Sequence, residues 1–332
     1  MSRIVQSALE YNYEHARISG AGTFLRIELM AKYIICLGKS TLDRIWPVSE
    51  LPASGGKYPA SDYLELGGGM AATASVAIAR LGAKAAFYGR AGKDRAGQAM
   101  LEELAGYGVD VSQFRLFPGG RSSVSGILVD KEGERIIANF GGASIPDDAG
   151  WLQLDDVQNT TAVLVDVRWK EGGVAICSAA RALGIPTVMD GEIANADIFA
   201  ALLPQVDHAI FSLPGLRSYG GGKITSHMQI LQKVRGLGCR VAAVTMGAQG
   251  CLWIDEEGAH HQPAFGVQVV DTTGAGDVFH GAYALALAEG MDIPTAMRFA
   301  SGVAALKCTR HGGRAGIPSR EEVDRFLAQQ TH

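Results

Sequence analysis

The sequence predicts an α/β fold in which a mostly parallel central sheet is covered by helices on both faces and carries a small β-sheet lid. From residue 33 onward, short apolar runs alternate with longer segments of helical periodicity, which is the pattern of successive β-α-β units. Strands joined in this way lie parallel, and their helices cover both faces of the sheet. Two stretches, 46–66 and 114–139, interrupt the alternation and predict the lid.

The individual elements are predicted from two patterns, short apolar runs for strands and helical spacing of small and apolar residues for helices. Tyr33–Leu37 is an apolar run that ends at Gly38, so we expect it to be the first strand. Ala71–Leu81 repeats small and apolar residues at helical spacing, and Ala85–Tyr88 is the next apolar run. Later strands are expected at 162–167, 187–189, 208–211, 241–245 and 267–270, and later helices at 97–106, 173–183, 228–237, 277–289 and 293–307.

The two interrupting stretches have a different periodicity. Within the second, Ser123–Val129 and Arg135–Asn139 alternate apolar and polar residues and contain no long helix. Alternation of this kind is typical of antiparallel strands with one face in water. We therefore expect both stretches to form a lid inserted in the α/β domain.

The N-terminus is expected to lie outside this domain. Residues 1–29 precede the first strand and lack the apolar core of a signal peptide, so export is not indicated. We interpret them as an N-terminal extension that is disordered, or as a mis-assigned start before Met30, and expect their loss to leave activity intact. An amphipathic arm that docks on a partner is the alternative. Residues 30–330 then form one domain.

Composition excludes several classes of protein. In 332 residues, 47% hydrophobic and 19% charged side chains provide for a sizeable core and argue against disorder over most of the chain. The net charge of −4 lacks the basic excess that nucleic-acid binding requires, and no apolar run suffices for a transmembrane helix. The five cysteines are scattered and indicate neither disulfides nor a zinc site, which favours the reducing cytoplasm.

The most informative segment is the turn Gly274-Ala275-Gly276-Asp277, which precedes an expected helix. The unpaired N–H groups and the positive dipole end of a helix attract an anion, and glycine lets a phosphate approach the backbone closely. Asp277 is expected to be stabilised as the ion there, yet beside a phosphate it is placed to accept a proton from an attacking hydroxyl. The alternative is that Asp277 only stabilises the start of its helix.

Two signatures resemble those of the ribokinase/PfkB family of carbohydrate kinases. Val269–Ala282 is similar to the second signature, and Gly68–Gly82 followed by Gly89–Asp94 is similar to the first. The resemblance covers residues 33–328 and implies a ribokinase-like fold. Within the family, the sequence is most similar to bacterial 6-deoxy-6-sulfofructose kinases, through 67–74, 166–169, 190–192 and 298–310.

The resemblance implies roles on the nucleotide side. Asp277 would be the general base, and the N–H groups of Gly274, Ala275 and Gly276 would form an anion hole. ATP with Mg²⁺ would be the phosphoryl donor. The residues implied for ATP binding are Thr245, Gly247, Gly250, Gly276 and Cys308. A K⁺ ion beside the anion hole would be held by Asp271, Thr273 and the carbonyl groups of Lys307, Arg310, Gly312 and Gly316.

On the sugar side, the resemblance assigns Asp43 to the sugar hydroxyl groups and brings the backbone of Gly68 and Gly69 close to the sugar. The positions that match sulfonate-binding residues are Lys57, Asn139 and Arg168. A guanidinium, an ammonium and an amide together suit a tetrahedral anion. The implied reaction is phosphorylation of O1 of 6-deoxy-6-sulfofructose, by a homodimer formed through the lid.

The sequence departs from the family at two places, and three alternatives stay open. Ser212 and Gly215 replace an Asn-x-x-Glu that organises Mg²⁺ and phosphate, and Thr73 replaces the asparagine of the first signature. The substrate could be another ketohexose or a sugar acid, of the fructose or fructose-phosphate type. The motif Gly67-x-Gly69-x-x-Ala72 formally matches an NAD(P)-dependent oxidoreductase, although the expected ribose-binding acid is missing. A non-catalytic sugar sensor is the third alternative.

Histidines near these segments invite a metal interpretation. His260 and His261 are adjacent, and His280 lies close to the anion turn. Adjacent side chains on a strand face opposite ways, and no carboxylate spacing supports a zinc site. We therefore expect these histidines to face solvent or to pack.

Overall fold

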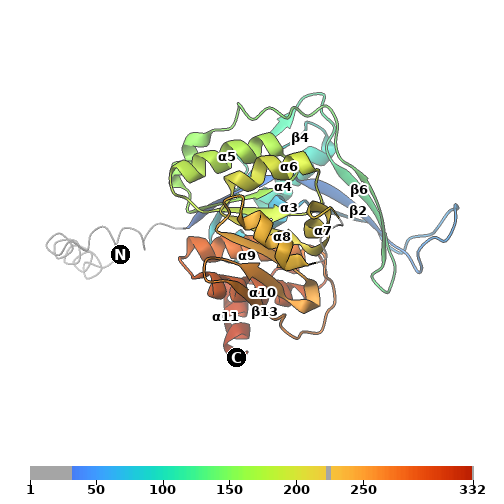
Figure 1. Ribbon diagram of the computed structural model, residues 1–332. Coiled ribbons are helices and arrows are strands. Elements are labelled where there is room, and N and C mark those ends of the chain that lie inside the picture. Colours follow the sequence, from blue (N-terminus) through green and yellow to red (C-terminus); the bar gives the residue numbers. More distant parts are fainter. Residues whose placement is uncertain (1–31, 222–225, 331–332) are drawn as a thin grey trace, which may run out of the picture. The chain divides into compact units, whose positions relative to one another are not determined.

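The computed structural model describes residues 32–221 and 226–330 (Figure 1), so the expected N-terminal extension, residues 1–29, lies outside the described residues. The strands are β1 (Tyr33–Gly38), β2 (Thr41–Pro47), β3 (Leu64–Gly68), β4 (Lys84–Gly92), β5 (Phe114–Phe117), β6 (Val124–Val129), β7 (Arg135–Phe140), β8 (Ala162–Asp166), β9 (Thr187–Gly191), β10 (His208–Ser212), β11 (Val241–Thr245), β12 (Cys251–Ile254) and β13 (Ala259–Gln262).

The α-helices are α3 (Met70–Arg80), α4 (Arg95–Gly106), α5 (Lys170–Ala182), α6 (Ala196–Leu202), α7 (Leu213–Tyr219), α8 (His227–Arg235), α9 (Ala275–Ala288), α10 (Ile293–Cys308) and α11 (Arg320–Gln329). Short 3-10 helices are η1 (Leu154–Asn159), η2 (Leu203–Gln205) and η3 (Gly247–Gln249). In the part of the chain that is described, no helix has the length and apolar character needed to span a membrane.

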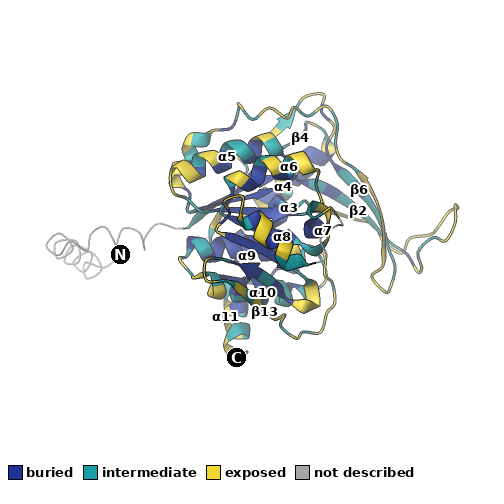
Figure 2. Ribbon diagram, in the orientation of Figure 1, coloured by how far each residue is buried: buried dark blue, intermediate teal, exposed yellow. Residues whose placement is uncertain are grey.

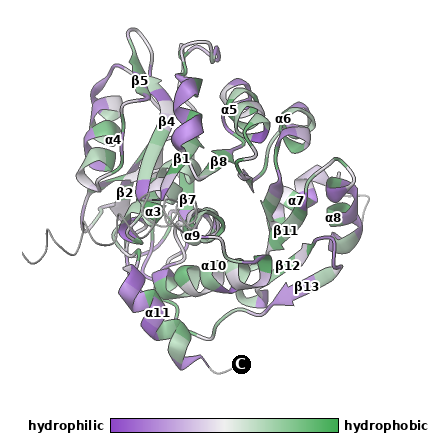
Figure 3. Ribbon diagram, turned by 90° about the vertical axis from the view of Figure 1, so that its left-hand side faces the viewer, coloured by the Kyte–Doolittle hydropathy of each residue, from purple (hydrophilic) through white to green (hydrophobic). Residues whose placement is uncertain are grey.

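The central sheet confirms the predicted fold class. Its strand order is β13-β12-β11-β10-β9-β8-β1-β4-β5, and every pairing from β11 to β5 is parallel. The hairpin β12–β13 adds two antiparallel strands at one edge, which the sequence analysis missed. Figure 3 shows the apolar strand β11 in green and the edge strand β13 in purple. Strand β11 is buried and therefore apolar, whereas β13 at the sheet edge is partly exposed and carries polar side chains.

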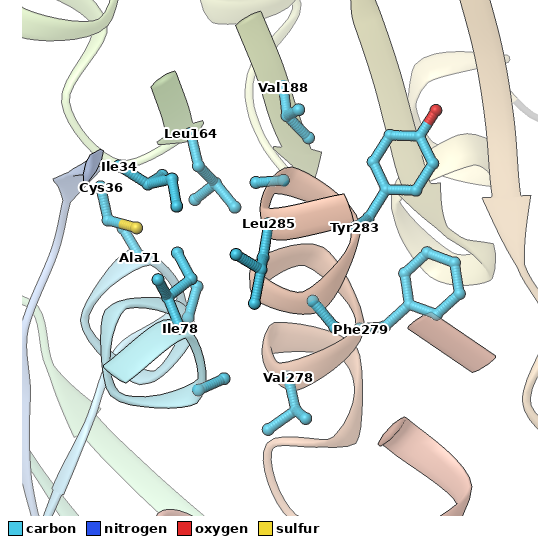
Figure 4. Close-up of a cluster of buried hydrophobic side chains, with 14 of the residues drawn as sticks. Ile34, Cys36, Ala71, Ile78, Leu164, Val188, Val278, Phe279, Tyr283 and Leu285 are labelled. Atoms are coloured by element: carbon cyan, nitrogen blue, oxygen red, sulfur yellow. The ribbon is translucent and has the colours of Figure 1, made fainter. Parts of the chain in front are cut away.

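Both faces of the sheet are covered, and the two faces bury separate apolar clusters. On β1, Ile34 and Cys36 belong to one cluster, whereas Ile35 and Leu37 belong to the other. Figure 4 shows the first cluster between the sheet and helices α3 and α9, and Figure 2 shows the buried centre in dark blue. The alternation of side chains along a strand produces this division.

The lid is a second sheet of order β3-β2-β6-β7. The prediction of a small separate sheet is confirmed, but three details were wrong. The lid begins at Thr41 rather than at residue 46, and β2 pairs with β6 in parallel. Phe114–Phe117 belongs instead to the central sheet as β5, because Phe114 is buried edge-on against Phe87 with ring centroids 5.1 Å apart. Residues 48–63 contain no strand.

The topology of β3 also removes the dinucleotide-binding alternative. The strand that carries Gly67 lies in the lid, antiparallel to β2, and the next strand along the chain, β4, lies in the central sheet. A dinucleotide-binding unit requires both strands to be parallel members of one sheet. The motif Gly67-x-Gly69-x-x-Ala72 therefore does not form such a unit.

The strand expected at 267–270 is absent from the structure. Val269 and Val270 are 59% and 43% exposed, so their apolar character does not reflect burial. The amides of Val270 and Asp271 both donate to the carbonyl of Cys308, at 2.8 and 3.1 Å, and the segment runs into the anion turn as an extended loop. The sheet position beside β11 is occupied by β12.

Candidate active site

The turn before α9 has the geometry of an anion site. Gly274 adopts φ 74°, a left-handed conformation that favours glycine, and α9 begins at the next residue. The amide of Ala275 donates to the Thr272 carbonyl at 3.1 Å, so one of the three predicted anion-hole donors is engaged within the turn. Gly276 is exposed at the start of the helix, where amide groups lack helical acceptors.

Asp277 lies half-buried in the first turn of α9. Burial raises its pKa to about 7, the charge of Asp190 adds to the rise, and the charges of His280 and Arg314 oppose it. We expected stabilisation of the ion, but desolvation and a second carboxylate outweigh the helix dipole. A carboxyl group with this pKa changes its protonation state near neutral pH, which suits proton transfer.

His280, one turn along α9, lies behind Asp277. Its Nδ1 is 2.7 Å from the Gly276 carbonyl and 3.4 Å from Asp190 Oδ2, and its Nε2 is 3.1 Å from the Ile210 carbonyl. The prediction that this histidine packs is confirmed, since only 1% of it is exposed. Asp190 is also buried, and burial followed by the charge of Asp166 raises its pKa well above the usual range.

Of the other two histidines, His260 packs and His261 is exposed to solvent. His260 stacks on Trp253 with ring centroids 5.1 Å apart and lies 2.9 Å from Asp255 Oδ1, and His261 Nε2 is 2.8 Å from the Gln249 carbonyl. No group of three or more metal-ligating side chains occurs within residues 32–221 and 226–330.

Asp271 organises the loop before the turn. Its Oδ1 accepts from the Thr273 amide at 2.8 Å and its Oδ2 from the Gly312 amide at 2.9 Å. Although burial raises the pKa of Asp271, hydrogen bonds from Thr273 and the charge of Lys307 hold it below the usual range. The structure thus brings Thr273, Lys307 and Gly312 to Asp271, but Lys307 contacts it through its ammonium and Gly312 through its amide, not through the carbonyl groups predicted to hold K⁺.

The predicted nucleotide loop follows β11. Thr245 ends that strand with its hydroxyl 3.3 Å from the Phe211 carbonyl, and Gly247 and Gly250 adopt φ 57° and 83° around η3. Cys308 ends α10, and its carbonyl accepts from the amides of Val270 and Asp271. These positions lie at the carboxyl end of β11 and at the loop before the turn, where ligands of α/β sheets bind.

The structure explains the departure at Ser212 and Gly215. Ser212 is the N-cap of α7, where its Oγ accepts from the Gly215 amide at 3.0 Å. A Cβ at Gly215 would overlap the Gly191 carbonyl, so the site accommodates no glutamate. Mg²⁺ commonly keeps several waters and binds through substrate phosphates and one or two carboxylates, so a site without a glutamate at 215 is compatible with it.

On the sugar side, one row of polar residues crosses the lid. Asp43 on β2 is in register with Ser125 on β6, which is in register with Asn139 on β7. Asn139 Nδ2 donates to Ser125 Oγ at 3.0 Å. Burial raises the pKa of Asp43, and the hydrogen bond from Ser125 opposes the rise. The row places a carboxyl group and an amide on one face of the lid.

Gly68 and Gly69 connect the lid to α3 and leave no room for side chains. A Cβ at Gly68 would overlap the Asp43 carboxylate, and one at Gly69, where φ is 98°, would overlap the Lys39 carbonyl. The prediction that glycine here permits close approach of the backbone therefore has a steric basis.

A cavity of about 270 Å³ lies between the β1–β2 turn, the loop after β7 and the segment after β8. Lys39, Arg90 and Arg168 line it, and Asp147, an acidic residue that also lines it, pairs with Arg90. Of the three residues predicted to bind an anion, only Arg168 lines this cavity. Lys57 lies exposed in the segment 48–63, away from the residues that line this cavity.

A larger cavity of about 720 Å³ lies at the opposite edge of the sheet, where β9, β10 and β11 begin. It is lined by Pro186, Asp207 and Arg240 among others, and none of the predicted site residues contributes to it. Because ligands of such sheets bind at the carboxyl ends of the strands, the smaller cavity is the candidate for the sugar end of the site, although neither Asp277 nor the Gly274–Gly276 turn lines it.

Four charged residues at the site were missed by the sequence analysis. Asp166 ends β8 and accepts from the amides of Lys39 and Arg168, at 2.9 and 2.8 Å. Arg135 on the lid donates to Thr273 Oγ1 at 2.8 Å and so joins the lid to the turn. Only Asp166 had a sequence signal, as an acid at the end of a buried strand. The others are Lys39, Arg135 and Arg314.

Sequence comparison identifies the family to which this architecture belongs. The pfkB family of carbohydrate kinases matches residues 31–320. Ribokinase of Bacillus subtilis (strain 168) is 29% identical over 300 residues, which cover 89% of this chain and 99% of that protein. Deoxyribokinase of Salmonella typhi is 25% identical over 302 residues, covering 89% and 98%.

Solved structures of similar fold support the same family assignment. A structure from Agrobacterium tumefaciens, provisionally named a ribokinase, has a TM-score of 0.85 and 36% identity and covers 90% of this chain and 98% of its own. Arabidopsis thaliana ribokinase, solved with ribose and ATP, has a TM-score of 0.81 and 25% identity and covers 91% and 100%. The chain therefore belongs to the pfkB family and is an ATP-dependent carbohydrate kinase with a ribokinase-like fold.

Proposed function

We propose that this kinase phosphorylates a ketohexose that carries an anion at the end opposite the reacting hydroxyl, with O1 of 6-deoxy-6-sulfofructose as the acceptor. The observation that supports an anionic sugar is the cavity lined by Lys39 and Arg168, beside the row that contains Asp43. Neither cation forms an ion pair with a described residue, although Arg168 Nη1 donates to the Ile193 carbonyl at 2.7 Å. A sugar phosphate or sugar acid of the fructose type is the second candidate.

The proposed mechanism uses Asp277 as general base. The carboxylate takes the proton of the sugar hydroxyl while the hydroxyl oxygen attacks the γ-phosphorus of ATP, and the bond from that phosphorus to the β–γ bridging oxygen of ADP breaks. The amide groups of Gly274 and Gly276 in the turn stabilise negative charge on the transferred group. Mg²⁺ bound with the nucleotide would neutralise further phosphate charge.

Two further proposals concern the nucleotide site and a homodimer. Thr245, Gly247, Gly250 and Cys308 border the nucleotide in this arrangement. A homodimer formed through the lid would cover its exposed apolar side chains, which are Tyr63, Leu64, Leu66, Ile136 and Ile137. Apolar groups gathered on one small sheet are typical of an interaction surface.

Activity is expected to rise with pH through about 7. Asp277 accepts a proton only when it is ionised, and its pKa is raised to about 7, so the active fraction grows as pH increases past that value. The measurement is kcat/KM for the sugar from pH 5.5 to 9 at saturating MgATP. A rate that stays constant from pH 5.5 to 8 would contradict the assignment of the base.

Arg168→Ala is expected to lower kcat/KM about 100-fold for sulfofructose and fructose 6-phosphate, but less than threefold for fructose, because one charge-assisted contact to the anion is lost. Arg325→Ala, which removes an exposed guanidinium on α11, is the matched control. The experiment compares the three sugars with each enzyme. Preference of the wild type for neutral fructose, or an equal loss for all three sugars in Arg168→Ala, would refute the anionic substrate.

A further inference from the structure

Lys307, in the last turn of α10, has its charged end inside the protein. Its exposed fraction is 0%, and its Nζ donates to the backbone carbonyl of Asp271 at 2.8 Å. The same ammonium lies 3.8 Å from the Asp271 carboxylate. Lysine is rarely buried unless its charge is balanced, so Asp271 is the counter-ion that keeps the ammonium there.

The loop before the anion turn is built around this ammonium. Asp271 also accepts from the amides of Thr273 and Gly312, and its own amide donates to the Cys308 carbonyl. The loop gains little from apolar burial, because Val269 and Val270 are exposed. Polar contacts through Asp271 therefore define the path by which the chain enters the turn at Gly274.

The two oxygen atoms that contact the Lys307 ammonium belong to Asp271, one of the residues that the sequence analysis assigned to a K⁺ ion. Asp271 supplies both a carboxylate and a carbonyl, and both face the ammonium. Arg135 brings a second positive charge, since its Nη1 is bonded to Thr273 Oγ1. A further cation at the same oxygens would face two positive charges at short range, so the residues present do not fit a bound K⁺.

We propose that the Lys307 ammonium replaces the monovalent cation beside the anion turn, so that this kinase needs no K⁺. An ammonium is a compact positive charge with three donors, and it orders carbonyl and carboxylate oxygens as a small cation does. Lys307 is therefore a positioning residue for the turn. The proposal rests on the proposed role of that turn in phosphoryl transfer.

The first test uses the wild-type enzyme. Its kcat and its thermal midpoint are measured in 100 mM KCl and in 100 mM tetramethylammonium chloride, a cation too large for the site. We expect kcat to agree within twofold and the midpoint within 1 °C. Stimulation of kcat by K⁺ of tenfold or more, or a midpoint raised several degrees by K⁺ alone, would overturn the proposal.

The second test removes the ammonium. In tetramethylammonium chloride, Lys307→Ala is expected to lose at least about tenfold in kcat, because the turn loses its internal cation. Adding K⁺ or NH₄⁺ to this variant should restore kcat severalfold and raise its midpoint, whereas Lys84→Ala, at an exposed position of β4, should respond to neither ion. A folded Lys307→Ala enzyme that neither ion rescues would overturn the proposal.

The two tests separate this inference from the proposed function. If the wild type phosphorylates none of the sugars, the proposed function fails, while the midpoints of wild type and Lys307→Ala still report on the cation. If Lys307→Ala does not fold, the wild-type comparison in the two salts decides the proposal alone.

Discussion

Asp277→Asn is expected to lower kcat by about 10³-fold, because general-base catalysis contributes about 10²–10⁴ and asparagine cannot accept the proton. The amide has the size of the carboxyl group, so the start of α9 should keep its geometry. MgATP should bind with little change, since the turn amides stay in place. The measurements are kcat with the sugar and the dissociation constant of MgATP by calorimetry.

The control for this variant is Asp324→Asn, an exposed acid on α11 that pairs with Arg320. It should leave kcat within twofold. Full residual activity in Asp277→Asn would refute the mechanism. Loss of both kcat and MgATP binding would instead indicate that the aspartate holds the turn together.

Glu103→Ala is expected to destabilise the fold by about 3 kcal/mol, because it leaves the buried guanidinium of Arg314 without its counter-ion. Only 2% of the Arg314 side chain is exposed, and its Nη1 lies 3.1 Å from Glu103 Oε2. The same guanidinium donates to the Gly68 carbonyl at 2.9 Å and lies 3.4 Å from Thr73 Oγ1. Denaturant unfolding of wild type and variant measures the loss.

A double variant separates the ion pair from packing. Glu103→Leu combined with Arg314→Met removes both charges, so it should be more stable than Glu103→Ala alone. The matched control is Glu321→Ala, which breaks an exposed pair with Arg325 and should leave stability almost unchanged. If Glu103→Ala is no less stable than Glu321→Ala, the buried pair does not stabilise the fold.

Arg314 also connects the sugar side to the anion turn. Arg314 belongs to the loop after α10, and the Gly68 carbonyl that it contacts lies 246 positions earlier in the chain. Its charge also opposes the rise in the pKa of Asp277. Thr73, one of the positions where the sequence analysis found a departure, lies beside this guanidinium.

Local patterns in the sequence were sufficient for most elements. The apolar runs at Tyr33–Leu37 and at 241–245 became β1 and β11, because these strands are buried and their signal is continuous. The segment at 267–270 has the same apolar character but no neighbouring strand to pair with, so it became a loop. Periodicity records which side chains are apolar, whereas the presence of a partner strand depends on the rest of the chain.

For the site, the sequence was sufficient to predict the candidate anion turn, since Gly274-Ala275-Gly276-Asp277 is contiguous and each residue has a local reason to be there. The tertiary structure decided which charges meet. It brought Lys39 and Arg168 to one cavity, left Lys57 in solvent, and buried the Lys307 ammonium against Asp271. Contacts between residues far apart in the chain depend on how strands and loops come together, and no local sequence pattern encodes which of these residues meet.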